Sequence, residues 1–153
     1  MHDLTIHPLA ANQLPLVYPL VRAVMPSVTL DSWLRYGRGL IGARQQGQSG
    51  VVACTRRGRA LPCGMFCWRR ERDPEKGEVM VAEHFVALDI LDPRPVHEKL
   101  MAELERMGRA QGCAAIRSAI HNHSSGLQAA FLAAGHRPTG ALLSKDLPAG
   151  RAV

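Results

Sequence analysis

The chain has 153 residues and a formal net charge of +6, with 46% hydrophobic and 21% charged residues. One domain with a real core fits this length, and the balanced composition excludes a disordered or fibrous protein. No apolar run approaches the roughly 20 residues that span a bilayer, and the N-terminus lacks a basic segment followed by a hydrophobic one. We therefore expect a cytoplasmic protein.

The positive charge suits an anionic partner, which could be a nucleotide cofactor, a nucleic acid or an acidic surface. The arginines are scattered over several segments, and few aromatic residues are present to stack on bases, so nucleic acid ranks last among these partners. The four cysteines are Cys54, Cys63, Cys67 and Cys113. Their spacing indicates neither disulfides nor a zinc site, and buried thiols in a reducing compartment are expected.

The N-terminal half predicts a strand, two helices and a β-hairpin. In chain order these are a strand over residues 4–9, helices over 12–26 and 29–43, and hairpin strands over 50–55 and 63–70. Pro26 ends the first helix, because proline has no N–H to donate. Thr29 or Asp31 is the N-cap of the second helix, and Gly42 is its stop. Gly58 lies near the tip of the hairpin.

The C-terminal half alternates strands with helices. We expect a strand over residues 79–91, a helix over 96–112, a strand over 114–121, a helix over 124–136 and a last strand over 141–147. The first of these strands is apolar on both faces and is therefore central. The first helix places Leu100, Leu104 and Met107 on one stripe. The whole order predicts an α/β protein with a mixed sheet and helices on both faces.

This order resembles that of the GCN5-related N-acetyltransferase superfamily, whose members transfer an acyl group from coenzyme A to an amine. Family members carry an Arg/Gln-x-x-Gly-x-Gly/Ala loop after the fourth strand, followed by a helix that ends in Gly. Counting back from Gly112 puts that loop on residues 92–97, "DPRPVH". A second shared feature is a Tyr four residues before a Gly-aromatic pair, which here reads "FLAAGH", with Phe131 at the Tyr position.

The resemblance implies one such domain over residues 1–153, with a mostly antiparallel central sheet. The strand, helices and hairpin of about residues 1–78 would shape the acceptor side, and about residues 79–147 would bind coenzyme A. It implies an N-acyltransferase that uses acetyl-CoA or another acyl-CoA, without a metal, on an unidentified amine or peptide. A homodimer is compatible with the resemblance. The alternatives are a noncatalytic binding protein with the same fold and, third, a nucleic-acid-binding protein.

In the family, the backbone N–H groups of the loop and the helix N-terminus hold the pyrophosphate of coenzyme A. Here Asp92 replaces the Arg/Gln, and Pro95 and His97 replace the two glycines. The donors that remain are the Arg94 side chain and the N–H groups of Val96, His97 and Glu98, with a charged His97 as a further aid. The alternative is an ordinary helix start, with Pro95 in the first turn and Asp92 as its cap.

The resemblance also implies that the pantetheine arm of coenzyme A bonds to strand backbone at Val86, Ala87 and Leu88, between the fourth and fifth strands. Asn122 lies two residues before a site where the family often has a cofactor-contacting Asn, and Ser124 occupies that site itself. Phe131 cannot donate a proton. The departing thiolate would therefore leave unassisted, or be protonated by His136, Tyr36 or a water.

Glu83 is the candidate general base, because it lies in an apolar strand where burial would raise its pKa. Alternatively, Glu83 is a structural residue, either paired with another side chain or located at an edge of the sheet. His84 is a weaker candidate, because strand alternation would point it to the opposite face. The "HNH" of residues 121–123 is read as a polar turn, since a metal site would need further ligands.

Overall fold

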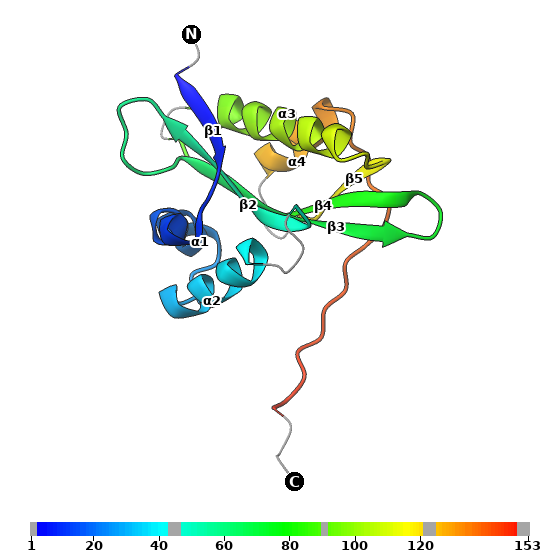
Figure 1. Ribbon diagram of the computed structural model, residues 1–153, viewed down its shortest axis with the longest axis horizontal. Helices are drawn as coiled ribbons and strands as arrows, with labels where there is room; N and C mark the ends of the chain where they lie inside the picture. The colour runs from blue at the N-terminus through cyan, green and yellow to red at the C-terminus, as the bar shows by residue number, and fades with distance from the viewer. Residues whose placement is uncertain (1–2, 43–46, 90–91, 121–124, 150–153) are drawn as a thin grey trace.

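Figure 1 shows the fold in a computed structural model, which describes residues 3–42, 47–89, 92–120 and 125–149. The elements are β1 (Leu4–Pro8), the 3-10 helix η1 (Ala11–Val17), α1 (Tyr18–Val24), α2 (Leu30–Ile41), β2 (Ser49–Arg56), β3 (Gly64–Asp73), β4 (Gly77–Ala87), α3 (Arg94–Ala110), β5 (Ala115–Ser118) and α4 (Ser125–Ala133). None of the described helices has the length and apolarity to cross a bilayer.

The five strands form one sheet in the order β1-β2-β3-β4-β5, so every strand lies beside its neighbour in the chain. The first three pairs are antiparallel, and β4 with β5 is parallel. Helices α1 and α2 cover one face of this sheet, and α3 and α4 cover the other (Figure 1). The predicted α/β class is confirmed, with a mostly antiparallel sheet between helices.

Side-chain alternation along β3 divides the interior into two cores. Phe66 packs with Leu100 of α3 on one face, whereas Met65 packs with Trp33 of α2 on the other. All four side chains are fully buried or nearly so. The period-2 pattern of β3 thus holds the two helical layers on opposite sides of the sheet.

A glycine allows α3 to approach the start of β3 closely. A Cβ atom at Gly64 would lie 2.6 Å from Cγ1 of Val96 and 3.1 Å from the carbonyl oxygen of Val86. Any side chain at this position would push the first turn of α3 away from the sheet. Gly64 therefore fixes where the helix begins above β4.

The first predicted helix is two elements instead of one. Residues 11–17 form η1, which contains Pro15, and α1 then starts afresh with Pro19 in its first turn. Two prolines four residues apart remove backbone donors that one continuous helix would need, so the chain restarts. The second helix behaves as predicted: Oγ1 of Thr29 accepts the Ser32 N–H at 3.1 Å. It ends at Gly42, whose N–H donates to the Arg38 carbonyl at 2.8 Å.

The prediction of a last strand over residues 141–147 is wrong. Residues 137–149, which we call the C-terminal arm, are exposed throughout and form neither strand nor helix. The arm leaves the body of the molecule instead of joining the sheet (Figure 1). A strand pattern alone does not supply a partner strand, and the single chain brings none to this segment.

Candidate active site

Strands β4 and β5 part partway along β4. Their register pairs run from Val79 with Ala115 to Ala82 with Ser118 and then stop. A last contact joins the Ala119 N–H to the Ala82 carbonyl at 3.0 Å. Beyond it, residues 83–87 of β4 have β3 on one side and no described strand on the other, which leaves a gap in the sheet.

The parting coincides with an irregularity in β4. His84 has a φ of 54°, in the left-handed region that non-glycine residues seldom adopt. The register with β3 also shifts between Met65 and Cys67. The side chain of His84 consequently lies on the α2 face, where its ring contacts Tyr36, and not on the opposite face as strand alternation predicted. A bulge of this kind re-aims side chains, which period-2 reasoning cannot foresee.

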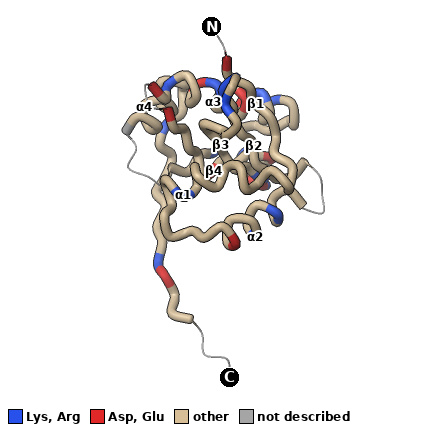
Figure 2. Tube along the Cα trace, turned by 90° about the vertical axis from the view of Figure 1, so that its left-hand side faces the viewer, with Lys and Arg blue, Asp and Glu red and all other residues tan. Residues whose placement is uncertain are grey.

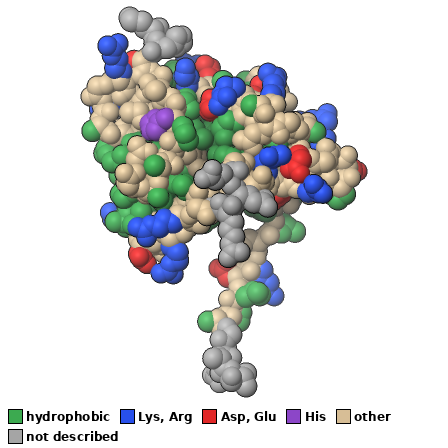
Figure 3. All heavy atoms as spheres, in the orientation of Figure 1, with side chains coloured by type: hydrophobic (Ala, Val, Ile, Leu, Met, Phe, Trp, Pro, Cys, Tyr) green, Lys and Arg blue, Asp and Glu red, His purple; other side chains and the backbone are tan. Residues whose placement is uncertain are grey.

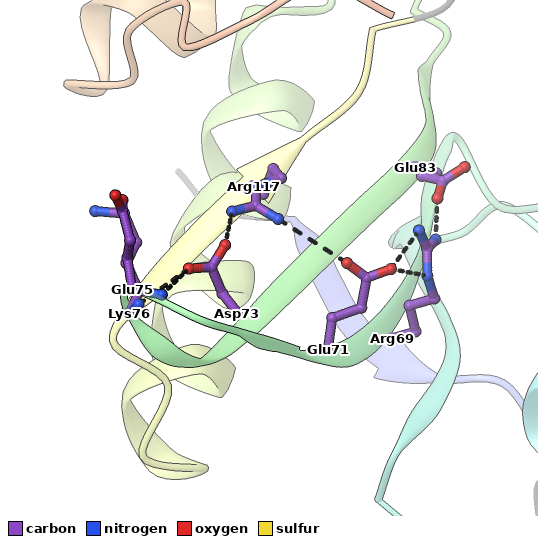
Figure 4. A network of polar contacts seen from close by, with 7 residues as sticks. All are labelled: Arg69, Glu71, Asp73, Glu75, Lys76, Glu83 and Arg117. Carbon is purple, nitrogen blue, oxygen red and sulfur yellow. Dashed lines mark hydrogen bonds and ion pairs between the residues drawn. The ribbon is translucent and has the colours of Figure 1, made fainter.

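Glu83 is tied into a row of alternating charges that crosses the sheet (Figure 4). Its carboxylate forms an ion pair with Arg69 of β3, and the same guanidinium holds Glu71 at 2.9 Å. Arg117 of β5 continues the row to Asp73 at 2.7 Å. Glu83 is therefore a partnered carboxylate, 20% exposed, at the end of the row that adjoins the gap.

The row holds the Asp73 carboxylate in charged form. The Arg117 guanidinium, together with the N–H groups of Lys76 and Glu75, lowers the pKa of Asp73 to about 2. Hydrogen bonding to the ionised carboxylate is the reason, since it favours the charged form. No local sequence pattern indicates this row, because its members come from three strands whose register the sequence does not specify.

An apolar pocket lies at the gap, between the layers. It is lined by Val24 at the end of α1, Met25 just after it, His84 and Phe85 of β4, Ala119 and Ile120 after β5, and Leu127 of α4. Phe131 packs against Phe85, one of the lining residues, with ring centroids 5.1 Å apart. His136 packs edge-on against Phe131 at 4.9 Å. The two aromatic positions predicted from "FLAAGH" are thus brought to the site.

The backbone predicted to carry pantetheine lies along the same gap. Leu88 donates its N–H to the Cys63 carbonyl of the hairpin at 2.8 Å, toward β3. Because successive strand residues direct their peptide groups to opposite sides, the N–H and C=O of Ala87 face the gap. The Val86 side chain is buried in the α1/α2 core, whereas Leu88 is 46% exposed. Ala87 is thus the residue of this trio whose backbone is presented.

At the start of α3, the Arg94 guanidinium pairs with a carboxylate of the preceding loop. Arg94 forms a two-pronged ion pair with Asp92, with Nη2 at 2.9 Å from Oδ2 and Nε at 3.0 Å from Oδ1. The Arg94 N–H also donates to Asp92 Oδ1 at 3.1 Å. The guanidinium lowers the pKa of Asp92. The N-cap of the helix is Pro93 and not Asp92, which lies one residue before it and accepts the first N–H of the helix, and Pro95 lies exposed in the first turn.

His97 does not fit the expectation of a charged phosphate ligand. Its side chain is 4% exposed, and burial lowers its pKa. Its N–H donates to the Pro93 carbonyl at 3.0 Å, the first bond of the helix. Val96, whose side chain is buried, keeps a first-turn N–H at the helix start. The exposed Glu98 lies one residue further into the helix.

An arginine that the sequence did not single out for this site forms an ion pair just after β4. Arg56 of β2 pairs with Asp89, just after β4, and with Asp3 at 3.0 Å.

Asn122 and the "HNH" segment lie outside the described residues. Within the described ranges, no group of three or more His, Cys, Asp or Glu side chains could hold a metal ion.

The sequence matches no protein-family model, and a search of the curated proteins finds no match either. Solved structures do match the fold. The aminoglycoside N-acetyltransferase AAC(6')-Iy, solved with coenzyme A, aligns with a TM-score of 0.79 at 18% identity over 94% of each chain. Glucosamine-6-phosphate N-acetyltransferase from Arabidopsis thaliana aligns at 0.76 and 13% identity over 96% of this chain and 100% of that one.

A third structure is the ribosomal-protein-alanine N-acetyltransferase of Brucella melitensis biovar Abortus 2308. Its TM-score is 0.74 at 11% identity, over 95% of this chain and 100% of that one. The chain therefore has the fold of the GCN5-related N-acetyltransferase superfamily, as the sequence resemblance predicted.

Proposed function

We propose that this protein is an acyl-CoA-dependent N-acyltransferase that uses acetyl-CoA to acylate an amine. The observation that carries the proposal is the parting of β4 and β5 after Ala82, which presents strand backbone, an apolar pocket and the Glu83 carboxylate at one place. Solved structures with this fold are described as N-acetyltransferases, one of them in complex with coenzyme A, which supports the choice of cosubstrate.

In the proposed reaction the acceptor nitrogen attacks the thioester carbonyl carbon, a C–N bond forms and the C–S bond breaks. Glu83 accepts the proton of the amine, directly or through a water, and the ion pair with Arg69 holds the carboxylate in position. Backbone N–H groups beside the gap, with Ala87 the best presented, hold the pantetheine arm and stabilise the oxyanion.

The departing thiolate takes up one proton and leaves as free coenzyme A. Tyr36 is one proposed donor, and it lies beside the bulge because its ring packs on His84. Burial raises the pKa of Tyr36, so its hydroxyl keeps its proton at neutral and mildly basic pH. His136 and water are the other proposed donors, with His136 held against Phe131.

The pyrophosphate would lie at the start of α3, where Val96 offers an N–H and Arg94 offers a guanidinium. Arg94 must leave Asp92 to meet a phosphate, and its 79% exposed side chain has room to do so. The phosphate would thus compete with Asp92 for the same guanidinium. This competition predicts weaker coenzyme A binding than a glycine-rich loop would give.

Thermal melting with and without acetyl-CoA tests the proposal, because a ligand that binds only the folded state raises the midpoint. We expect a rise at millimolar acetyl-CoA that is reduced in Arg94→Ala. Arg106→Ala is the matched control, since Arg106 is an exposed arginine of the same helix, paired with Glu103 away from the loop. A midpoint that millimolar acetyl-CoA leaves unchanged would contradict the proposal.

A noncatalytic binding protein is the second candidate, and the ion pair of Arg94 with Asp92 favours it, because the pair occupies the cation that a phosphate needs. Release of the coenzyme A thiol from acetyl-CoA, measured over a panel of primary amines, separates the two functions. An acyltransferase releases thiol faster with at least one amine than without. Binding of acetyl-CoA without any amine-dependent release would favour the noncatalytic function.

A further inference from the structure

Two cysteine side chains meet at the base of the hairpin that β2 and β3 form. Cys54 is the last buried residue of β2 and is 0% exposed, and Cys63 comes just before β3 and is half-buried. Both side chains pack on the face of the sheet that α3 covers. Figure 3 shows the hairpin turn beyond them at the surface of the molecule, in the place that it has in Figure 1.

The backbone holds the two residues at the spacing that a disulfide needs. Gly64 is the register partner of Cys54, and Cys63, one residue earlier, donates its N–H to the Cys54 carbonyl at 2.8 Å. Sγ of Cys63 lies 3.4 Å from the same oxygen, and the two thiols are hydrogen-bonded to each other. Hydrogen-bonded neighbours on antiparallel strands have Cα atoms about 5.5 Å apart, and disulfides form at Cα separations of about 4.4–6.8 Å. An S–S bond between them therefore needs no change of register.

The two sulfurs differ in reactivity. The hydrogen bond from the Cys54 thiol, with help from the Arg56 guanidinium, lowers the pKa of Cys63 to about 7, so Cys63 has thiolate character at neutral pH. The same hydrogen bond raises the pKa of Cys54, which keeps its proton. Lysine and arginine positions gather around α3 and β1 (Figure 2), the two elements beside Cys54.

We propose that Cys54 and Cys63 form a reversible oxidation site, in which hydrogen peroxide oxidises Cys63 and Cys54 then closes a disulfide. In the first step the Cys63 thiolate attacks a peroxide oxygen, the O–O bond breaks, and Cys63 becomes a sulfenic acid while hydroxide leaves. In the second step the Cys54 sulfur attacks the Cys63 sulfur, the S–O bond breaks, and water leaves with the Cys54 proton. The two thiols lose two electrons, the peroxide gains them, and a dithiol reductant reverses the reaction.

Burial divides the roles of the cysteines. Hydrogen peroxide reaches the half-buried Cys63, whereas the fully buried Cys54 reacts only with its neighbour. Cys67, the next cysteine of β3, is buried on the opposite face of the sheet, and burial raises its pKa. Cys67 therefore neither reacts with the peroxide nor competes with Cys54 for the sulfenic acid.

A disulfide at this place would move the residue that holds the end of β4. An S–S bond is about 2.05 Å long, so the two sulfurs must come closer than hydrogen-bond contact. Cys54 is fixed within β2, which pairs on both sides, whereas Cys63 precedes β3, so Cys63 makes the movement. Its carbonyl accepts the Leu88 N–H at 2.8 Å. Oxidation should loosen this bond and disturb the backbone assigned above to the pantetheine arm, and only this last consequence rests on the proposed function.

Treatment of the full chain with hydrogen peroxide, followed by alkylation with iodoacetamide and tryptic digestion, tests the proposal. We expect mass spectrometry to show a loss of two hydrogen atoms per chain and a peptide pair that joins Cys54 to Cys63, both reversed by dithiothreitol. Cys113→Ser is the matched control, because it removes another half-buried cysteine, and it should give the same link. Cys63→Ser should give none. An absent link, or one that joins Cys63 to Cys67 or Cys113, would overturn the proposal.

Replacing Cys54 separates the two steps. Dimedone captures sulfenic acids, and Cys54→Ala leaves the Cys63 sulfenic acid without a partner thiol. With dimedone present throughout and the reaction followed to completion, Cys63 should be labelled about tenfold more in Cys54→Ala than in the parent chain. Cys54→Ser, which keeps the size of the side chain, repeats the measurement, and thermal midpoints check both folds. Equal labelling in the parent chain and the variants would contradict closure of the disulfide.

Hydrogen exchange of the Leu88 amide, followed by NMR in the reduced and oxidised parent chain, tests the movement of Cys63. We expect exchange about threefold faster or more after oxidation, because the bond to the Cys63 carbonyl is loosened. Equal rates would overturn this part of the proposal. None of these measurements uses acetyl-CoA. A disulfide that forms in a chain without affinity for acetyl-CoA would refute the proposed function and leave the oxidation site standing.

Discussion

The imidazole ring of His84 meets the phenol ring of Tyr36 edge-on, with ring centroids 5.5 Å apart and planes at 87°. This contact joins the bulge of β4 to helix α2 across the candidate site. It brings together a residue of β4 and a residue of α2 that are 48 positions apart in the chain. The positive φ of His84 is what makes the meeting possible.

Replacing Tyr36 tests whether its hydroxyl protonates the departing thiolate. We expect Tyr36→Phe to lower kcat by about 10- to 100-fold, within the range of general acid catalysis, while the ring contact and the thermal midpoint are kept. Tyr36→Ala should lower both kcat and the midpoint, because the ring is lost as well. If Tyr36→Phe keeps full kcat, the proton comes from His136 or water.

Glu83→Gln tests the general base. Loss of a proton acceptor should reduce kcat/KM by about 10²- to 10⁴-fold, and the rise in melting midpoint with acetyl-CoA should remain. Glu71→Gln is the matched control, because Glu71 binds the same Arg69 guanidinium from β3. An equal loss in both variants would show that the row of charges, and not Glu83 itself, supports the reaction.

Gly64→Ala should destabilise the fold, because its new Cβ atom would meet Val96 at 2.6 Å. Overpacking of this kind costs about 1–3 kcal/mol in the free energy of unfolding, which urea denaturation measures. Gly39→Ala on the open side of α2 is the control, since a Cβ atom there meets nothing within 4 Å. A stability gain of up to about 1 kcal/mol is expected for the control. Equal effects in the two variants would contradict the close approach of α3.

Cys63 should be the most reactive of the three hairpin thiols. A hydrogen bond from the Cys54 thiol is the main cause that lowers the pKa of Cys63 to about 7, and Arg56 assists. Burial raises the pKa of Cys67, and the hydrogen bond to Cys63 raises that of Cys54. The thiolate is the nucleophile, so the rate of alkylation by iodoacetamide should rise with pH and reach half its plateau near pH 7.

Mass spectrometry of the alkylated peptides assigns that rate to Cys63. Cys54→Ala removes the hydrogen-bond donor and should move the midpoint of the rate profile to higher pH. Cys63→Ser should abolish the fast phase. A midpoint that is the same in the parent chain and in Cys54→Ala would contradict the hydrogen-bonded pair.

Local signals in the sequence predicted most of the elements. Thr29 and Gly42 bound α2 because capping depends on residues within one turn. Gly58 lies at the hairpin tip with a φ of 80°, which glycine adopts without strain. Prediction failed where a long-range partner decides the outcome. Residues 141–147 have a strand pattern, but the single chain gives them no neighbouring strand.

The sequence predicted where the candidate site lies better than it predicted the contacts that its residues make. Position along the chain was enough to put Glu83, residues 86–88 and Phe131 around one gap. The ion pair of Glu83 with Arg69 depends on the register of β3 with β4. The direction of the His84 side chain depends on a bulge. Neither the register nor the bulge is encoded by a local sequence pattern. Burial of His97 likewise follows from how α3 packs on the sheet.

The placement of β5 at the end of the sheet bears on how the molecule opens. Strand β5 is attached to the sheet by four register pairs with β4. Strands β2 and β3 are each at least eight residues long and pair with a strand on both sides. The least anchored strand should separate at a lower free energy than global unfolding requires. One wall of the candidate site is therefore part of the most weakly held unit of the fold. In the proposed acyltransferase reaction, transient detachment of that unit would admit a bulky acceptor without any hinge between domains.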